Sequence, residues 1–180
     1  MIIDHTKAIQ AYGSDYRLGQ ALKQGQIHKI ERGIYASQPQ ISPFEVLFFK
    51  YPQAVLTLNT AFYIHGLTDV IPEKIYLATA RGASRIRTPN IVQVFSEDRF
   101  LQEGKINLQY DGAQVQVYSQ ERMLVEAMRN LKTLPLDYYR EIISSYRARV
   151  DSLDVQQVER YIALFERNTF MLDIFQREVL

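Results

Sequence analysis

The chain offers few side chains that could carry out catalysis or bind a metal. It has no cysteine, which excludes disulfides, thiolate zinc sites and thiol nucleophiles. Its three histidines are His5, His28 and His65, and none has a second histidine or a carboxylate at metal-ligand spacing. The sequence also lacks a Gly-rich phosphate-binding loop and the Gly-x-Ser-x-Gly motif of a nucleophilic serine. We therefore expect no catalytic residue, no metal site and no cofactor.

Among enzymes, a metal-dependent nuclease is the nearest match, through Asp69, Glu73 and Lys74. In that chemistry carboxylates hold the metal and a lysine assists the attack. The required pattern has an acidic residue and a lysine separated by one residue along a strand, whereas Glu73 and Lys74 are adjacent. Pro72 also places this segment in a loop that enters a strand. The sequence therefore favours a binding protein over an enzyme.

The most suggestive side chains are basic and amide groups near the N-terminus. Residues 1–36 carry five Lys or Arg and three Asp or Glu, a net charge of 5 − 3 = +2, while the whole chain has a net charge of +1. Long basic side chains reach DNA phosphates, and a glutamine can pair with an adenine edge through two hydrogen bonds. The candidate DNA-binding residues are Arg17, Gln20, Lys23, Gln24, Lys29 and Arg32. The alternative is that they are solvated side chains on a small amphipathic unit.

Two further groups of residues are candidates for a partner or nucleic-acid surface. The densest basic stretch is 81–87, which combines three arginines with Gly and Ser. The segment 138–149 combines tyrosines with arginines, and part of it is expected to face away from the core. The candidate residues are Arg81, Arg85 and Arg87 in the first group, and Tyr138, Arg140 and Arg147 in the second. For the first group, solvated loop residues are the more ordinary interpretation.

The N-terminal candidates lie on a predicted helix, a second helix and a hairpin. Ile2, Ile9 and Tyr12 share one helical stripe that ends at Gly13, and a second helix runs from the N-cap Ser14 to Gly25. Residues 27–30 and 34–36 are predicted strands around a Gly-containing turn. In this arrangement one helix can enter the major groove of DNA while the hairpin flanks it. The sequence therefore predicts a winged-helix-like DNA-binding unit over residues 1–37.

The remaining residues, 42–180, are predicted to form a mixed α/β domain after a proline-containing linker. A helix begins at Ser42-Pro43 and ends near Pro52, and a short helix capped by Asn59 ends at Gly66. The clearest hairpin joins residues 106–110 and 113–118 through Asp111-Gly112. Further strands are predicted at 54–58, 74–80 and 91–95, and helices after Ser119. The expected fold class is α+β, with the small N-terminal unit followed by this domain and its C-terminal helical bundle.

Composition supports a folded chain without a membrane partner. The 180 residues are 47% apolar and 23% charged, which is typical of globular proteins. No apolar run approaches the roughly 18 residues that a membrane-spanning helix needs. The first residues carry neither the basic start nor the apolar core of a signal peptide. We therefore expect a soluble, cytoplasmic protein.

Three segments of the chain carry motifs of a known family. The first is 15–35, which ends in Arg-Gly-Ile-Tyr. The second is 51–72, with the strand 75–79 after it. The third is 118–126, which contains Glu-Arg-Met-Leu. In this order the three segments, which span most of residues 15–130, resemble the AbiEi family of antitoxins from abortive-infection, or type IV, toxin–antitoxin systems.

The resemblance implies a function that spacing alone does not. Such proteins bind and repress their own promoter through a winged helix, which would place Arg17, Lys23, Lys29 and Arg32 on DNA-contacting elements. Their C-terminal region counters a nucleotidyltransferase-like toxin of the AbiEii type, directly or indirectly. A full winged helix has one more helix before the helix pair, and about twelve residues precede Gly13 here. The alternative is a toxin-interaction protein with a vestigial winged helix and no DNA binding.

Overall fold

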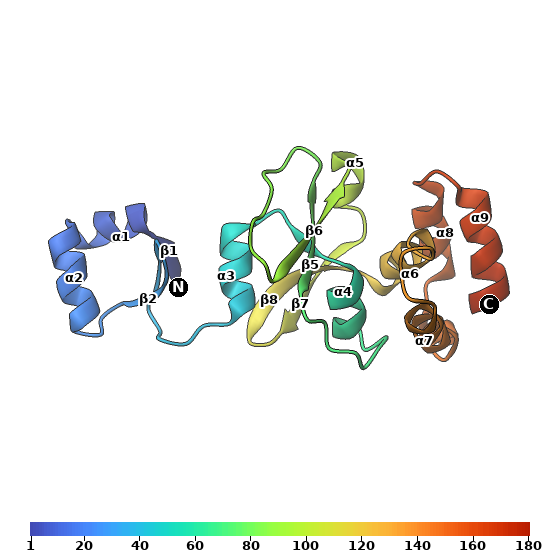
Figure 1. Cartoon of the computed structure of the whole chain (residues 1–180), viewed down its shortest axis with the longest axis horizontal. Coiled ribbons are helices and arrows are strands. Elements are labelled where there is room, and N and C mark those ends of the chain that lie inside the picture. The colour runs from blue at the N-terminus through green and yellow to red at the C-terminus, as the bar shows by residue number, and fades with distance from the viewer. The chain divides into compact units, whose positions relative to one another are not determined.

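The computed structural model describes all 180 residues and shows a mixed α/β protein with two sheets (Figure 1). The chain divides into two compact units. The first unit comprises Met1–Pro52 together with Gln109–Val115, and the second comprises Gln53–Leu108 and Gln116–Leu180. The first unit thus extends beyond the predicted 1–37. It includes the helix at 43–50 and the tip of the 105–118 hairpin, where the rings of Phe44 and Tyr110 meet edge to face at 5.4 Å.

The first unit is built from a three-stranded antiparallel sheet and three helices. The strand order is β1-β3-β2, and both pairs of neighbours are antiparallel. The elements in chain order are β1 (Ile2–Asp4), α1 (His5–Tyr12), α2 (Asp15–Lys23), β2 (His28–Glu31), β3 (Ile34–Ala36) and α3 (Pro43–Lys50).

One prediction for this unit is wrong: Ile2 belongs to a strand and not to the first helix. Ile2 pairs with Ala36, and Ile3 with Tyr35, which completes the edge of the small sheet. The side chain of Asp4 accepts a hydrogen bond from the backbone of Lys7 at 2.8 Å, so the helix starts only after Asp4. The β-branched pair Ile2-Ile3 suits a strand, and an adjacent N-cap separates it from the helix.

The core of the first unit fixes how its two N-terminal helices sit on the sheet. Gly13 ends α1 in the left-handed region at φ 85°, and Ser14 caps α2. The buried cluster takes residues from both helices and from β3, and Ile27 closes it before β2. Its members are Ala8, Leu18, Ala21, Ile27 and Tyr35. Because this face is buried, the opposite face of α2 is left to solvent.

The second unit has a five-stranded mixed sheet in the order β6-β5-β4-β8-β7. β5 and β6 are parallel, β4 is antiparallel to β5, and β4 is parallel to β8. The strands are β4 (Val55–Leu56), β5 (Ile75–Ala80), β6 (Ile91–Ser96), β7 (Lys105–Tyr110) and β8 (Ala113–Tyr118). The hairpin between β7 and β8 turns at Asp111-Gly112, both with positive φ, which confirms the predicted turn.

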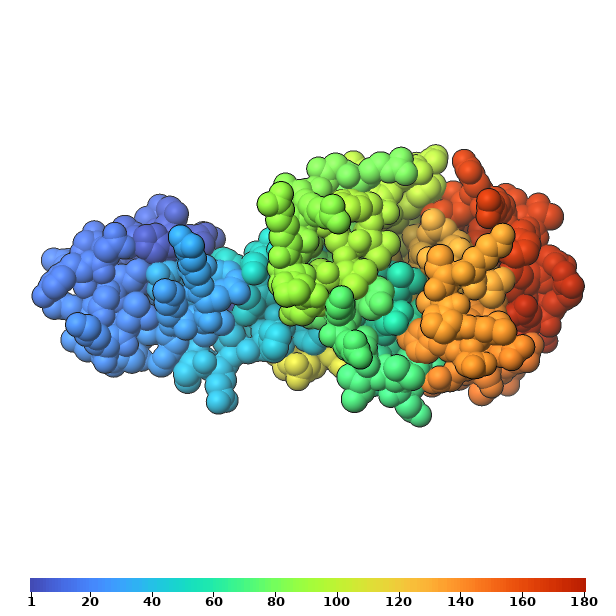
Figure 2. Space-filling model, in the orientation of Figure 1, coloured from blue at the N-terminus to red at the C-terminus, as the bar shows by residue number.

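Helices follow the sheet to the C-terminus, and residues of α6 and α7 form much of the core. Met123, Leu124, Ile142, Ile162 and Phe175 are completely buried. In the space-filling view the orange and red C-terminal helices adjoin the sheet residues of the same unit (Figure 2). The helices of this unit are α4 (Leu58–Ile64), α5 (Asp98–Leu101), α6 (Gln120–Arg129), α7 (Leu136–Arg147), α8 (Val155–Ala163) and α9 (Asn168–Ile174). None of the helices combines the length and apolar content that a bilayer span requires.

The start of α4 differs from the prediction, because Thr57 and not Asn59 is its N-cap. The backbone N–H of Thr57 donates to Tyr76 at 3.0 Å, which holds Thr57 in the sheet. The chain then turns into the helix at once, through Leu58 with φ 43°. The position of the cap is thus set by a bond to a strand that lies about 20 residues further along the chain.

Candidate functional site

All six predicted DNA-binding residues are exposed, and four of them lie on or next to α2. Arg17, Gln20 and Gln24 are spaced i, i+3 and i+7, so they share one helical face, with Lys23 beside them. Leu18 and Ala21 point the other way, into the core of the first unit. The helix therefore presents a continuous basic and amide surface.

The remaining two predicted residues, Lys29 and Arg32, are exposed on β2 and on the turn before β3. The nearby carboxylates are engaged elsewhere. Glu31 forms an ion pair of 2.8 Å with Lys50, and Asp15 lies 3.0 Å from His5. Arg17, Lys23, Lys29 and Arg32 form no ion pair within the chain. These four positive charges are free to interact with an external anion.

Tyr16 is a surface residue of α2 that the sequence did not single out as a candidate. Its side chain is 74% exposed, and its hydroxyl accepts a hydrogen bond of 2.9 Å from the amide of Gln20. An exposed aromatic side chain next to a glutamine adds a flat surface that can contact sugar or base. Its position one turn before Gln20 is the signal that could have identified it.

The second predicted basic group, Arg81, Arg85 and Arg87, lies in the loop between β5 and β6, and all three side chains are exposed. Gln93 on β6 fixes this loop. Its Oε1 accepts from the backbone of Ile86 at 2.8 Å, and its Nε2 donates to the carbonyl of Ser84 at 3.1 Å. Because the loop is tied down from inside, its arginines project outward.

The third predicted group, on α7, does not share a common environment. Tyr138 packs its ring against Phe62 at 6.2 Å, and its hydroxyl is buried. Arg140 and Arg147 are exposed and line a shallow groove together with Leu136. The Nε of Arg147 donates to the backbone carbonyl of Glu178, which attaches α7 to the C-terminal turn. The structure therefore brings Arg140 and Arg147 together, while Tyr138 contributes mainly to packing.

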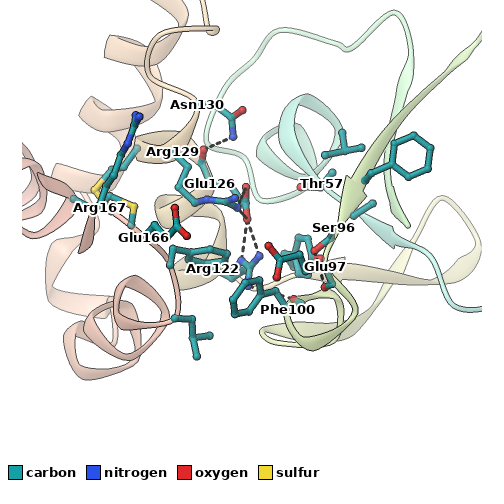
Figure 3. A pocket seen from close by; sticks show the side chains of 18 of the residues that line it. Thr57, Ser96, Glu97, Phe100, Arg122, Glu126, Arg129, Asn130, Glu166 and Arg167 are labelled. Atoms are coloured by element: carbon teal, nitrogen blue, oxygen red, sulfur yellow. Dashed lines mark hydrogen bonds and ion pairs between the residues drawn. The ribbon is translucent and has the colours of Figure 1, made fainter. Parts of the chain in front are cut away.

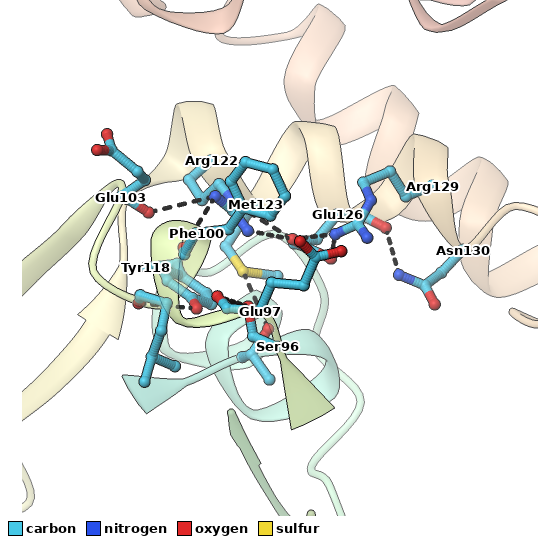
Figure 4. A network of polar contacts seen from close by, with 12 residues as sticks. Ser96, Glu97, Phe100, Glu103, Tyr118, Arg122, Met123, Glu126, Arg129 and Asn130 are labelled. Carbon is cyan, nitrogen blue, oxygen red and sulfur yellow. Dashed lines mark hydrogen bonds and ion pairs between the residues drawn. The ribbon is translucent and has the colours of Figure 1, made fainter. Parts of the chain in front are cut away.

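A buried polar network occupies the centre of the second unit (Figure 4). Arg122 is 1% exposed, and its Nη2 and Nε donate to Glu126 at 2.7 and 3.1 Å. Arg129 donates to both carboxylate oxygens of Glu126, at 2.8 and 3.0 Å. Glu126 is itself only 7% exposed. One carboxylate thus neutralises one of two guanidinium groups, and the network keeps a net positive charge.

Aromatic rings and a glycine complete the surroundings of Arg122. Its guanidinium lies over the rings of Tyr118 and Phe165, at 4.8 and 4.6 Å from their centroids. A side chain on Gly104 would place its Cβ 2.6 Å from the Cβ of Arg122. The carbonyl of Gly104 also accepts the backbone N–H of Ser119, the N-cap of α6, at 2.7 Å. The start of α6 is therefore held against Gly104, and Arg122 has a structural role.

His65 links the segments 51–72 and 118–126. Its Nε2 donates to the backbone carbonyl of Tyr118 at 2.6 Å, and Arg149 donates to its carbonyl at 2.9 Å. Burial lowers the pKa of His65 below its ordinary value of 6.5. The neutral tautomer with a proton on Nε2 is therefore the form that makes this contact.

We expect the free energy of unfolding to fall as the pH drops below 6.5. In the window between 6.5 and the lowered pKa of folded His65, the unfolded chain binds a proton that the folded chain does not, so stability rises with pH there. The contribution of one such proton is at most about 1.4 kcal/mol per pH unit. Urea denaturation over this pH range measures it. His65→Gln should flatten this dependence and the matched variant His28→Gln should retain it; an unchanged slope in His65→Gln would contradict the assignment.

A cavity of about 640 Å³ opens between the end of β6, α5, α6 and the turn from α8 to α9 (Figure 3). Nine of the residues that line it are charged. The cations are Arg81, Arg99, Arg122, Arg129, Lys132 and Arg167, and the carboxylates are Glu97, Glu126 and Glu166. Apart from Arg81, none of these residues is a site candidate from the sequence, because they come from distant segments.

No cluster of three or more His, Asp or Glu side chains forms a candidate metal site. Comparison with protein-family models and with curated proteins gives no match for this chain.

Proposed function

We propose that this chain is a DNA-binding antitoxin that represses its own promoter and counters a nucleotidyltransferase-like toxin of the AbiEii type. One observation carries the DNA-binding part. Arg17, Lys23, Lys29 and Arg32 are exposed on α2 and the β2–β3 hairpin, and none has a carboxylate partner. Unneutralised cations on a helix and an adjacent hairpin suit the phosphates on either side of a DNA groove.

The architecture of the first unit supports a winged-helix mode of binding. α1 and α2 are joined through Gly13 and Ser14, as in a helix-turn-helix pair, and β2 and β3 would form the wing. β1 pairs with β3 in the position of the third strand of such a sheet. We propose that α2 enters the major groove, where Gln20 and Gln24 would contact base edges.

The antitoxin part of the proposal rests on the resemblance to AbiEi proteins. The segments that carry it, 51–72 and 118–126, lie mainly in the second unit, where His65 contacts Tyr118 directly. Their most distinctive residues, His65 and Arg122, are occupied by internal hydrogen bonds. We propose that neutralisation uses exposed surfaces of this unit and involves no catalysis by the chain.

The alternative is a toxin-interaction protein that does not bind DNA. One observation favours it. Arg140 and Arg147 line an exposed groove on α7 that a protein partner could contact.

Measurement of DNA binding across a salt series separates the two. We expect the wild type to bind the DNA upstream of its own gene more tightly than a scrambled duplex of equal length. For the variant Arg17→Ala/Lys23→Ala/Arg32→Ala, each lost phosphate contact removes about 0.9 from the slope of log K against log salt. Fluorescence anisotropy should therefore show weaker binding and a slope that is smaller by about 2.7.

The matched control is Lys74→Ala/Arg160→Ala/Arg177→Ala, which removes three exposed cations from the second unit. It changes the net charge equally and should keep the wild-type slope. Equal loss in both variants would show that binding depends on overall charge only. No preference of the wild type for its upstream DNA would favour the toxin-interaction protein.

A further inference from the structure

We infer that the cavity of the second unit is a binding site for a mononucleotide, a phosphorylated ligand with one flat aromatic ring. All residues that line it belong to the second unit, so the inference does not depend on DNA binding by the first. Its volume of about 640 Å³ lies within the range of roughly 300–1,000 Å³ for small-molecule sites.

The cavity concentrates positive charge on a nearly neutral protein. Its six cations and three carboxylates give 6 − 3 = +3, while the whole chain has +1, so the other residues sum to 1 − 3 = −2. A concave surface lined by one sign of charge focuses its field on the enclosed space. An anion is therefore the favoured occupant.

Part of this positive charge is neutralised by carboxylates of the protein, and the remaining positive charge indicates the negative charge expected of the ligand. Glu97 forms an ion pair with Arg99 at 3.0 Å, and Glu126 is shared by Arg122 and Arg129. Beyond these residues, Arg81, Lys132 and Arg167 have no carboxylate partner, and Glu166 is the one unpaired acid. The unpaired groups sum to 3 − 1 = +2, and Arg122, Arg129 and Glu126 together add 2 − 1 = +1, so the excess is +3. A phosphate monoester, with a charge of about −2 at neutral pH, neutralises most of this excess.

Arg129 supplies a pre-oriented hydrogen-bond donor at the wall of the cavity. Its Nη1 is fixed by both oxygens of Glu126, and its guanidinium lies over the ring of Phe165 at 3.9 Å. Its Nε and Nη2 donate to no group of the protein, and the side chain is 39% exposed. A guanidinium held in one orientation with free N–H groups is suited to a planar fork of phosphate oxygens.

The backbone at Arg167 is strained at the same place. Arg167 adopts φ 62° and ψ 30°, a left-handed conformation that is unfavourable for a non-glycine residue. Arg167 lies at the turn between α8 and α9, where it lines the cavity (Figure 3). Strain of this kind is concentrated at ligand-binding positions.

Aromatic side chains distinguish a nucleotide from a simple phosphate. Phe95 and Phe170 line the cavity and are 48% and 47% exposed, which is unusual for phenylalanine. They come from different elements, since Phe95 belongs to β6 and Phe170 to α9. A purine or pyrimidine base is a flat ring that stacks on such side chains.

Isothermal titration calorimetry of the full chain with the four ribonucleoside 5′-monophosphates tests the inference. We expect at least one of them to bind with a stoichiometry of one. The nucleoside of the monophosphate that binds, which lacks the charge, and inorganic phosphate, which lacks the ring, should each bind at least about tenfold more weakly than that monophosphate. Arg167→Gly should weaken nucleotide binding by about tenfold or more, since it removes one charged donor.

Arg167→Gly is chosen because glycine accepts the left-handed conformation, so the variant should fold at least as well as the wild type. Lys132→Ala, an exposed position, should also weaken binding, and Arg160→Ala, an exposed cation outside the cavity, should not. The inference is overturned if no monophosphate binds at millimolar concentration, or if Arg167→Gly and Lys132→Ala bind as the wild type does. It is also overturned if only a DNA oligonucleotide or an acidic peptide binds there without competition from AMP.

Discussion

Replacing Arg122 with alanine is expected to lower the free energy of unfolding by about 3–5 kcal/mol. The substitution leaves Glu126, which is 7% exposed, with Arg129 as its only cationic partner. It also removes the guanidinium from between Tyr118 and Phe165 and leaves a cavity there. Denaturation with urea, followed by circular dichroism, measures the loss.

A double substitution separates charge from packing in this network. Arg122→Met fills most of the volume and leaves Glu126 paired with Arg129 alone, so it should lose less stability than Arg122→Ala. In Arg122→Met/Glu126→Gln, Arg129 also loses its carboxylate partner, so this variant should be less stable than Arg122→Met alone. Arg160→Ala, a surface change in the same unit, should stay within about 0.5 kcal/mol of the wild type. A loss below about 1 kcal/mol for Arg122→Ala would show that the network does not stabilise the fold.

The second large effect is expected from Gly104→Ala, at about 3 kcal/mol or more. Gly104 has φ +77°, where a Cβ is strained. That Cβ would also lie 2.6 and 2.9 Å from Cβ and Cγ of Arg122 and 3.2 Å from the ring of Tyr161. Because the neighbours are the fixed base of a buried side chain and a packed ring, they cannot move aside easily. The free energy of unfolding from a denaturant titration measures the effect.

Gly112→Ala is the matched control, because Gly112 has φ +73° and no atom near its virtual Cβ. The free energy of unfolding of this variant should fall by only about 1 kcal/mol, the cost of placing a residue with a Cβ at positive φ. The difference between the two variants then measures the close approach of Gly104 to Arg122. Equal losses would contradict a steric role for Gly104.

These two predictions change the interpretation of the segment 118–126, which carries part of the resemblance to the AbiEi family. Arg122 is the largest completely enclosed side chain of the protein, and Ser119, its N-terminal neighbour in the motif, caps α6. Packing and helix capping are therefore sufficient to explain why Ser119 and Arg122 stand at these positions. Exposed residues such as Arg17 and Lys23, which no packing requirement explains, are the better indicators of what the protein binds.

Several features follow from local sequence because the interactions that produce them span only a few residues. Asp111-Gly112 supplies the two positive φ values of the β7–β8 turn. Ser42 and Pro43 start α3, and the residue before Pro52 ends it. The apolar periodicity likewise predicts that Leu18 and Ala21 lie on the buried face of α2. The polar residues on the opposite side of the helix are therefore the exposed ones.

Other features depend on contacts between distant segments, and the tertiary structure alone decided them. Ile2–Asp4 forms a strand because β3, about 30 residues later, pairs with it. β5 and β6 are parallel although only the loop 81–90 joins them. Parallel neighbours are usually connected by a helix, and the sequence has no helical pattern here from which the parallel pairing could be predicted. The cavity collects Arg81, Arg129 and Arg167 from three parts of the chain. The sequence by itself determined most of the helices and strands, the exposed face of α2 and the basic surface near the N-terminus, since caps, turns and periodicity are short-range. The order of the sheet, the burial of Arg122 and the charge of the cavity required the fold, because long-range packing decides which side chains meet.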